Sequence, residues 1–97
     1  MYFDWNEEKN GEIKKSRGIG FEDFIQAIED DRVLDIVEHH NKAQNPNQKL
    51  FVVEIDGYVY YVPFVKDDEG YFLKNIIPSR KLTKIYKKDQ NDEILKR

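Results

Sequence analysis

The sequence contains no cysteine, few prolines and no long hydrophobic run. The absence of cysteine from the 97 residues excludes a disulfide framework and a thiolate zinc site. The longest apolar stretch, Tyr58 to Val65, is interrupted by Pro63 and is far shorter than the roughly 20 residues of a membrane-spanning helix. Met1 leads into Tyr2-Phe3-Asp4-Trp5 without the basic and apolar regions of a signal peptide. These absences predict a cytoplasmic protein with no membrane contact.

The length of the chain favours one domain with a small core. We expect this domain to cover residues 1–88 and to be followed by a charged, frayed tail over residues 89–97. Since so short a domain has modest stability, a partner that buries more of its surface would add to it. A homodimer and a hetero-oligomer both remain open at this point.

The formal charge of −3 is unevenly distributed along the chain. Residues 1–40 carry eleven acidic and five basic side chains, whereas residues 71–97 carry three acidic and eight basic ones. Within Tyr71 to Lys88 there are six basic residues and no acidic residue. This segment would attract a polyanion, while a solvated helix face is the plain alternative.

The first forty residues predict a short strand followed by two helices. Tyr2 to Trp5 is typical of a strand or an extended segment, and Asn6 is a suitable N-cap for a helix that reaches about Ser16. Gly18 stands where a C-cap glycine is expected. The second helix follows from apolar residues at the spacing of one helix face: Phe21, Phe24, Ile25 and Ile28.

The remainder of the chain predicts four consecutive strands and a short helix. The strands are expected from about Val33, over Lys49 to Ile55, over Tyr58 to Val65 and over Tyr71 to Ile77. For Val33 to Val37, an extension of the second helix is the alternative. Asp56-Gly57 indicates a hairpin, and Pro63 indicates an edge or a bulge. Pro78 stops the last strand, and Ser79 caps a helix over Arg80 to Lys88. The predicted fold is α+β, with two N-terminal helices packed on a four-stranded antiparallel sheet and a short C-terminal helix.

Three stretches, in the same order along the chain, resemble the BrnT branch of the RelE-like toxins. The stretches are Phe3-Asp4-Trp5-Asn6-Glu7-Glu8-Lys9-Asn10, Arg17-Gly18-Ile19-Gly20-Phe21-Glu22-Asp23, and Ile76-Ile77-Pro78-Ser79-Arg80-Lys81 with Tyr86 following. Asn6 stands where the family usually has aspartate, and Arg17 replaces a histidine of the family pattern. The family is also often basic, whereas this chain is acidic.

The resemblance implies a RelE-like ribonuclease fold and the toxin role in a type II toxin–antitoxin pair. Such a toxin is a hydrolase that cuts RNA and halts translation, and its partner is a small DNA-binding antitoxin. No cofactor is expected. Metal-independent cleavage needs a base for the 2′-hydroxyl, an acid for the leaving oxygen and cations for the phosphorane charge.

The basic segment supplies the expected phosphate-binding side chains. Arg80 follows Ser79 at a helix start, where backbone N–H groups favour anions, and a guanidinium matches the geometry of a phosphate. Lys81 and Lys84 would assist. Further candidates for RNA binding are Lys74 and Arg17.

Other residues could supply proton transfer or stacking. His39 and His40 are the only histidines and could act as acid or base, although two solvated rings at a strand end are the simpler alternative. As a metal site they would lack an obvious third ligand. Tyr86 could stack on a base, donate a proton or pack the last helix on the sheet. Tyr58, Tyr60 and Tyr61 raise the possibility of base stacking.

A second hypothesis assigns no catalysis to the chain. It describes a toxin-fold binding module in which the acidic helices, Glu7 to Glu12 and Glu22 to Asp31, dock a basic partner protein.

Overall fold

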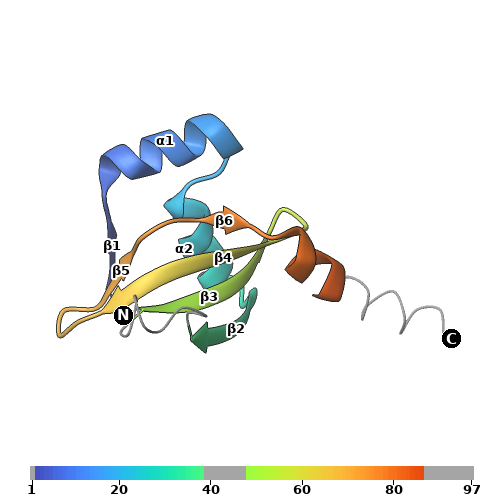
Figure 1. The fold of residues 1–97 in the computed structure, drawn as a ribbon. Coiled ribbons are helices and arrows are strands. Elements are labelled where there is room, and N and C mark those ends of the chain that lie inside the picture. The colour runs from blue at the N-terminus through green and yellow to red at the C-terminus, as the bar shows by residue number, and fades with distance from the viewer. Residues whose placement is uncertain (1, 39–47, 87–97) are drawn as a thin grey trace, which may run out of the picture.

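The computed structural model describes residues 2–38 and 48–86 as an α+β fold. In chain order the elements are β1 (Phe3–Trp5), α1 (Glu7–Arg17), α2 (Phe21–Glu29), β2 (Val33–Glu38), β3 (Gln48–Ile55), β4 (Tyr58–Lys66), β5 (Tyr71–Leu73) and β6 (Ile77–Pro78). Residues 80–86 form a further helical segment, here called the C-terminal helix (Figure 1). None of the described helices is long and apolar enough to cross a membrane. The expected tail over residues 89–97 lies outside the described residues.

The sheet has the strand order β1-β5-β4-β3-β2, with β6 paired to β4 beyond the end of β5. The four predicted strands do pair antiparallel in sequence. The prediction of a purely antiparallel, four-stranded sheet is nevertheless wrong in two details. β1 adds a parallel strand beside β5, with Phe3 opposite Tyr71, and the predicted strand from Tyr71 to Ile77 is divided into β5 and β6.

Hydrogen bonding at Pro63 explains the division between β5 and β6. The N–H of Lys74 donates to the carbonyl oxygen of Pro63 at 2.7 Å, and the next regular pairing on this side of β4 is between Tyr61 and Ile77. Because the N and O of a strand residue point to the same side, Pro63 offers no donor there. In the segment between β5 and β6, the Asn75 side chain accepts the N–H of Ile76. Of the two predicted alternatives for Pro63, an edge or a bulge, the edge is wrong, because Pro63 lies in an inner strand, opposite a local gap in the pairing.

One face of the sheet is covered by α2 (Figure 1). The predicted helical face is confirmed, because Phe21 and Phe24 are fully buried. They pack with apolar side chains of β3, β4 and β5 that all point to this face: Phe51, Val53, Val62, Phe64 and Leu73. α1 buries only Asn10 and Ile13, so its position depends on contacts with α2 rather than on an apolar face of its own.

Local signals at the helix ends and at the hairpin are also confirmed. The Asn6 side chain accepts the N–H of Lys9 at 3.0 Å, and Gly18 has the left-handed conformation of a C-cap. Asp56 and Gly57 have φ values of 52° and 81°, as the tight turn between β3 and β4 requires.

Candidate functional site

The C-terminal helix is fixed to β4 at its first turn. The Ser79 hydroxyl accepts the N–H of Leu82 at 3.1 Å, which confirms the predicted N-cap. The N–H of Ser79 donates to the carbonyl oxygen of Val59 at 3.0 Å. Thr83 completes the attachment, since its hydroxyl accepts the N–H of Val59 at 2.9 Å and donates to the carbonyl oxygen of Ser79 at 2.7 Å. The helix start is thus held in place by the backbone of an inner strand.

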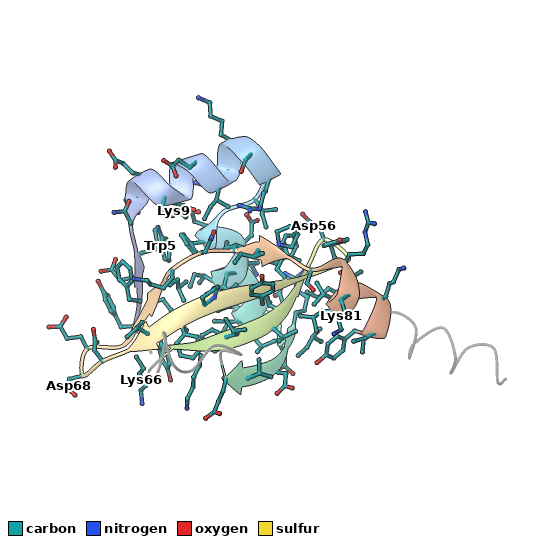
Figure 2. All side chains as sticks on the ribbon, in the orientation of Figure 1. Trp5, Lys9, Asp56, Lys66, Asp68 and Lys81 are labelled. Atoms are coloured by element: carbon teal, nitrogen blue, oxygen red, sulfur yellow. The ribbon has the colours of Figure 1, made fainter. Side chains whose placement is uncertain are left out.

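This anchored turn presents the basic side chains of the segment to solvent. Arg80, Lys81 and Lys84 are all exposed. Arg80 and Lys84 are four residues apart and therefore share one helix face, whereas Lys81 lies about 100° around the axis. Figure 2 shows Lys81 on this helix, at the end of the sheet away from Lys66. Positive charge therefore extends over at least two faces of the helix.

A second surface, the apolar groove, separates the C-terminal helix from β2. The groove has a volume of about 570 Å³ and lies on the sheet face opposite α2, because its β3 residues alternate with the core residues Phe51 and Val53. Its lining combines side chains of three strands with one side of the helix: Asp35, Val37, Glu38, Leu50, Val52, Tyr61, Lys81, Leu82, Ile85 and Tyr86.

The groove divides the residues that the sequence grouped around Arg80. Tyr86 is half-buried in the groove, whereas Arg80 is exposed and outside it. Lys81 lies at the groove rim. The structure therefore brings Tyr86 together with apolar side chains, in agreement with the packing alternative, and keeps Arg80 with Lys84 on the other side of the helix.

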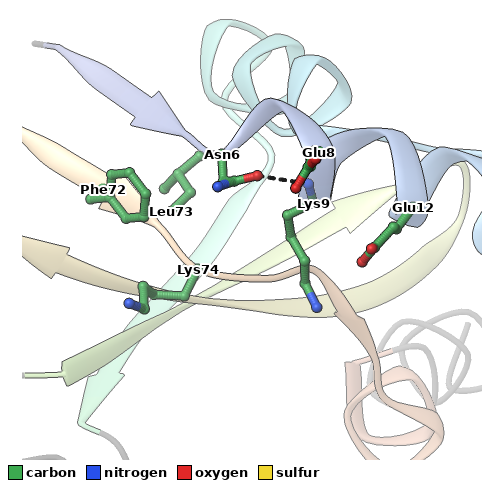
Figure 3. Close-up of a pocket in the computed structure, with 7 residues that line it drawn as sticks. All are labelled: Asn6, Glu8, Lys9, Glu12, Phe72, Leu73 and Lys74. Carbon is green, nitrogen blue, oxygen red and sulfur yellow. Dashed lines mark hydrogen bonds between the residues drawn. The ribbon is translucent and has the colours of Figure 1, made fainter.

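Lys74 is part of a different hollow, between α1 and the end of β5. Its ammonium group lies 5.5 Å from the ring centroid of Phe72. The hollow has a volume of about 500 Å³ and mixes both signs of charge (Figure 3). Its remaining lining residues come mainly from the first turns of α1: Asn6, Glu8, Lys9, Glu12 and Leu73. Lys74 therefore does not belong to the surface of the C-terminal helix.

The positive charge of Arg17, the last residue of α1, acts on Tyr60 in β4. Burial raises the pKa of Tyr60 above its ordinary value, the charges of Asp56 and Tyr58 add to this effect, and the positive charge of Arg17 opposes it. Tyr60 pairs with Pro78, two residues before Arg80. Tyr60 is thus influenced by the charge of Arg17 and is paired with the short strand that precedes Arg80.

The three tyrosines of β4 are divided between the two faces of the sheet, because successive side chains of a strand point to opposite faces. Tyr58 and Tyr60 are in edge-to-face contact, with ring centroids 5.6 Å apart, and Tyr60 also packs against the core. Tyr61 points to the other face and lines the apolar groove. All three rings are half-buried, so each has a structural role besides any ligand contact.

The two histidines, His39 and His40, lie outside the described residues. Within residues 2–38 and 48–86, no group of three or more histidine, aspartate or glutamate side chains is placed to hold a metal ion. Sequence reasoning missed Thr83, although the Ser79–Thr83 spacing of one helical turn is a usable signal. It also missed the groove, which only the assembled sheet creates. No family model, curated protein or solved structure matches the chain.

Proposed function

We propose that this chain is an RNA endonuclease toxin of a type II toxin–antitoxin pair, with a RelE-like fold and metal-independent cleavage. The observation that carries the proposal is the anchored helix start. Ser79 and Thr83 hold this turn on β4, so Arg80 and Lys84 are presented on a rigid support with no acidic residue nearby in the segment. A positioned guanidinium is suited to a phosphate, and a fixed one loses less entropy on binding.

The proposed division of roles follows the helix faces. Arg80 binds the scissile phosphate of the RNA. Lys84, one helical turn after Arg80, contacts the RNA backbone, and Lys81 contacts the same RNA strand from the groove side of the helix. Arg17 contributes positive charge from the end of α1. Proton transfer is assigned to His39 or His40. The resemblance to the BrnT toxins supports the substrate class, RNA, and the cognate antitoxin.

RNA binding and its salt dependence test the phosphate contacts. Binding of a single-stranded RNA is measured over a range of salt concentrations for the wild type, Lys84→Ala and Lys15→Ala, which removes an exposed charge from α1 instead. We expect Lys84→Ala to reduce the slope of log K against log salt by about 0.7, the value for one phosphate contact, and Lys15→Ala to leave it unchanged. Equal slopes for all three chains would contradict the proposed site.

Cleavage is tested separately from binding. Expression of the wild type is expected to arrest growth, and purified protein to cut RNA, while Arg80→Ala abolishes both and retains the folded CD spectrum. Normal growth at good expression of the wild type, together with intact RNA in vitro, would exclude the endonuclease.

A non-catalytic binding module is the second candidate, supported by the acidic surface of α1. Glu7, Glu8 and Glu12 are exposed there, and two of them line the mixed-charge hollow of Figure 3. On α2, by contrast, Glu22 and Asp23 are engaged in hydrogen bonds within the fold. Salt-sensitive binding of a lysine-rich peptide that is lost in Glu8→Gln/Glu12→Gln, without RNA cleavage, would favour this candidate.

A further inference from the structure

The apolar groove exposes large hydrophobic side chains on both of its walls. Ile85 is 46% exposed on its helix wall and Val37 is 37% exposed on its β2 wall. The floor between them is formed by Leu50, Val52 and Tyr61. A contiguous apolar hollow with charged residues at its rim is typical of a protein interface.

The charges at the rim have opposite signs on opposite walls. Asp35 lies on the β2 wall and Lys81 on the helix wall. Neither of them is a member of the ion pairs Lys14–Glu22 and Arg32–Asp30. A patch with an apolar centre, a negative side and a positive side is complementary to itself after a two-fold rotation about its centre. An isologous dimer needs this property, because each contact then occurs twice.

The edge of β2 is less suited to association than the groove. The Asp35 carboxylate accepts the N–H of Ile36 at 2.8 Å, and so blocks a donor that an added strand would use. β1, at the opposite edge of the sheet, is blocked in the same way, since Asp4 accepts the N–H of Trp5 at 2.8 Å. Strand addition is therefore disfavoured at both edges, whereas the second carboxylate oxygen of Asp35 remains available to a cation.

We propose that a second copy of this chain docks in the apolar groove, with Ile85 of each copy inserted beside Val37 of the other. Lys81 of each copy then pairs with Asp35 of the other, so that in the dimer the phosphate contacts are made by Arg80 and Lys84 and not by Lys81. The dimer is formed by the groove side of the C-terminal helix and leaves the side of Arg80 and Lys84 in solvent. Apolar fit and the pairing of opposite charges would hold this dimer together whether or not the chain cleaves RNA.

Sedimentation equilibrium of the full chain tests the apolar contact with a matched control. Ile85→Glu is expected to raise the dimer dissociation constant by at least about tenfold, because it places a charge in the interface centre. Ile36→Glu is the control, since Ile36 is 54% exposed but lies on the other face of β2. Its dissociation constant should stay that of the wild type, and CD melting verifies that both variants fold.

Exchange of the charges of Lys81 and Asp35 tests whether these two side chains face each other across the dimer interface. Lys81→Glu and Asp35→Lys should each weaken self-association, whereas an equimolar mixture of these two variants should form a heterodimer, because every rim contact is again between opposite charges. A wild type that stays monomeric up to about 1 mM overturns the proposal. So does a dimer that persists unchanged in Ile85→Glu, or a mixture of the charge variants that fails to associate.

Discussion

The side-chain oxygen of Asn10, in α1, accepts the N–H of Phe21, the first residue of α2, at 2.8 Å. Its amide group donates to Glu22 at 2.9 Å, and Asn10 is only 1% exposed. Gly20, the N-cap of α2, has no side chain for this purpose, and a Cβ there would lie 2.7 Å from the Asn10 oxygen. Part of the cap of α2 is thus supplied by α1, and the two hydrogen bonds of Asn10 tie the helices together.

Replacement of Asn10 should therefore destabilise the whole domain. Asn10→Ala leaves the N–H of Phe21 buried without its partner, which costs about 1–3 kcal/mol of unfolding free energy. Urea denaturation measures this value, and Glu12→Ala, an exposed position on the same helix, serves as the control. A change below the experimental error in Asn10→Ala would show that the cap contributes nothing.

Glu22 should contribute to the loss of stability in acid. The hydrogen bond from Asn10 is the largest cause that lowers the pKa of Glu22 from 4.5, and burial opposes it. Because the folded pKa lies below the unfolded one, the contribution is present above pH 4.5 and disappears as the pH falls through the folded pKa. Glu22→Gln should reduce the difference between urea midpoints at pH 7 and pH 3. Glu29→Gln, on the exposed side of α2, should leave that difference unchanged.

Thr83 should couple stability to RNA binding. Thr83→Val removes the hydroxyl that accepts the N–H of Val59, at a cost of about 1–2 kcal/mol, and releases the first turn of the C-terminal helix. RNA affinity should fall as well, since Arg80 then loses its rigid support. Thr83→Ser keeps the hydroxyl and should restore both readouts. If Thr83→Val lowered stability but bound RNA as the wild type does, the anchored turn would have no part in binding.

Replacement of two glycines by alanine should change the thermal stability in opposite directions. Gly70 has a φ of 149°, and a Cβ there would lie 2.3 Å from the carbonyl oxygen of Tyr2, so Gly70→Ala should disrupt the pairing of β1 with β5. Gly11 lies within α1 with no atom within 4 Å of its added Cβ, so Gly11→Ala should stabilise by up to about 1 kcal/mol. Thermal melting compares the two variants directly. A stabilising Gly70→Ala would contradict the close approach of Gly70 to the backbone of Tyr2.

Local signals predicted much of the fold. Phe21 and Phe24 mark the buried side of α2, and Asp56-Gly57 marks the hairpin, because in each case the residues that decide the structure are close in the sequence. The parallel partner of β1 could not be predicted in this way, since nothing in Phe3–Trp5 specifies Tyr71. The same is true of Asn10, because asparagine is typical of an exposed helix position and this one is buried only by its contact with α2.

The candidate site was predictable to the same extent. Ser79 and Arg80 identified the helix start, because an N-cap is a local motif. The attachment of Thr83 to Val59 depends on where β4 lies, and the groove depends on alternating residues of three strands. Neither pattern could be obtained from spacing along the chain.

The pairing of β1 with β5 also has a consequence for folding on the ribosome. Phe3 is synthesised before β2, β3 and β4, yet its partner Tyr71 is added only after these three strands are complete. Closing so long a loop has a high entropic cost, which the ordered β3–β4 hairpin reduces by bringing β5 into place. β1 therefore leaves the ribosome before the other strands of the sheet and is one of the last of them to find its position.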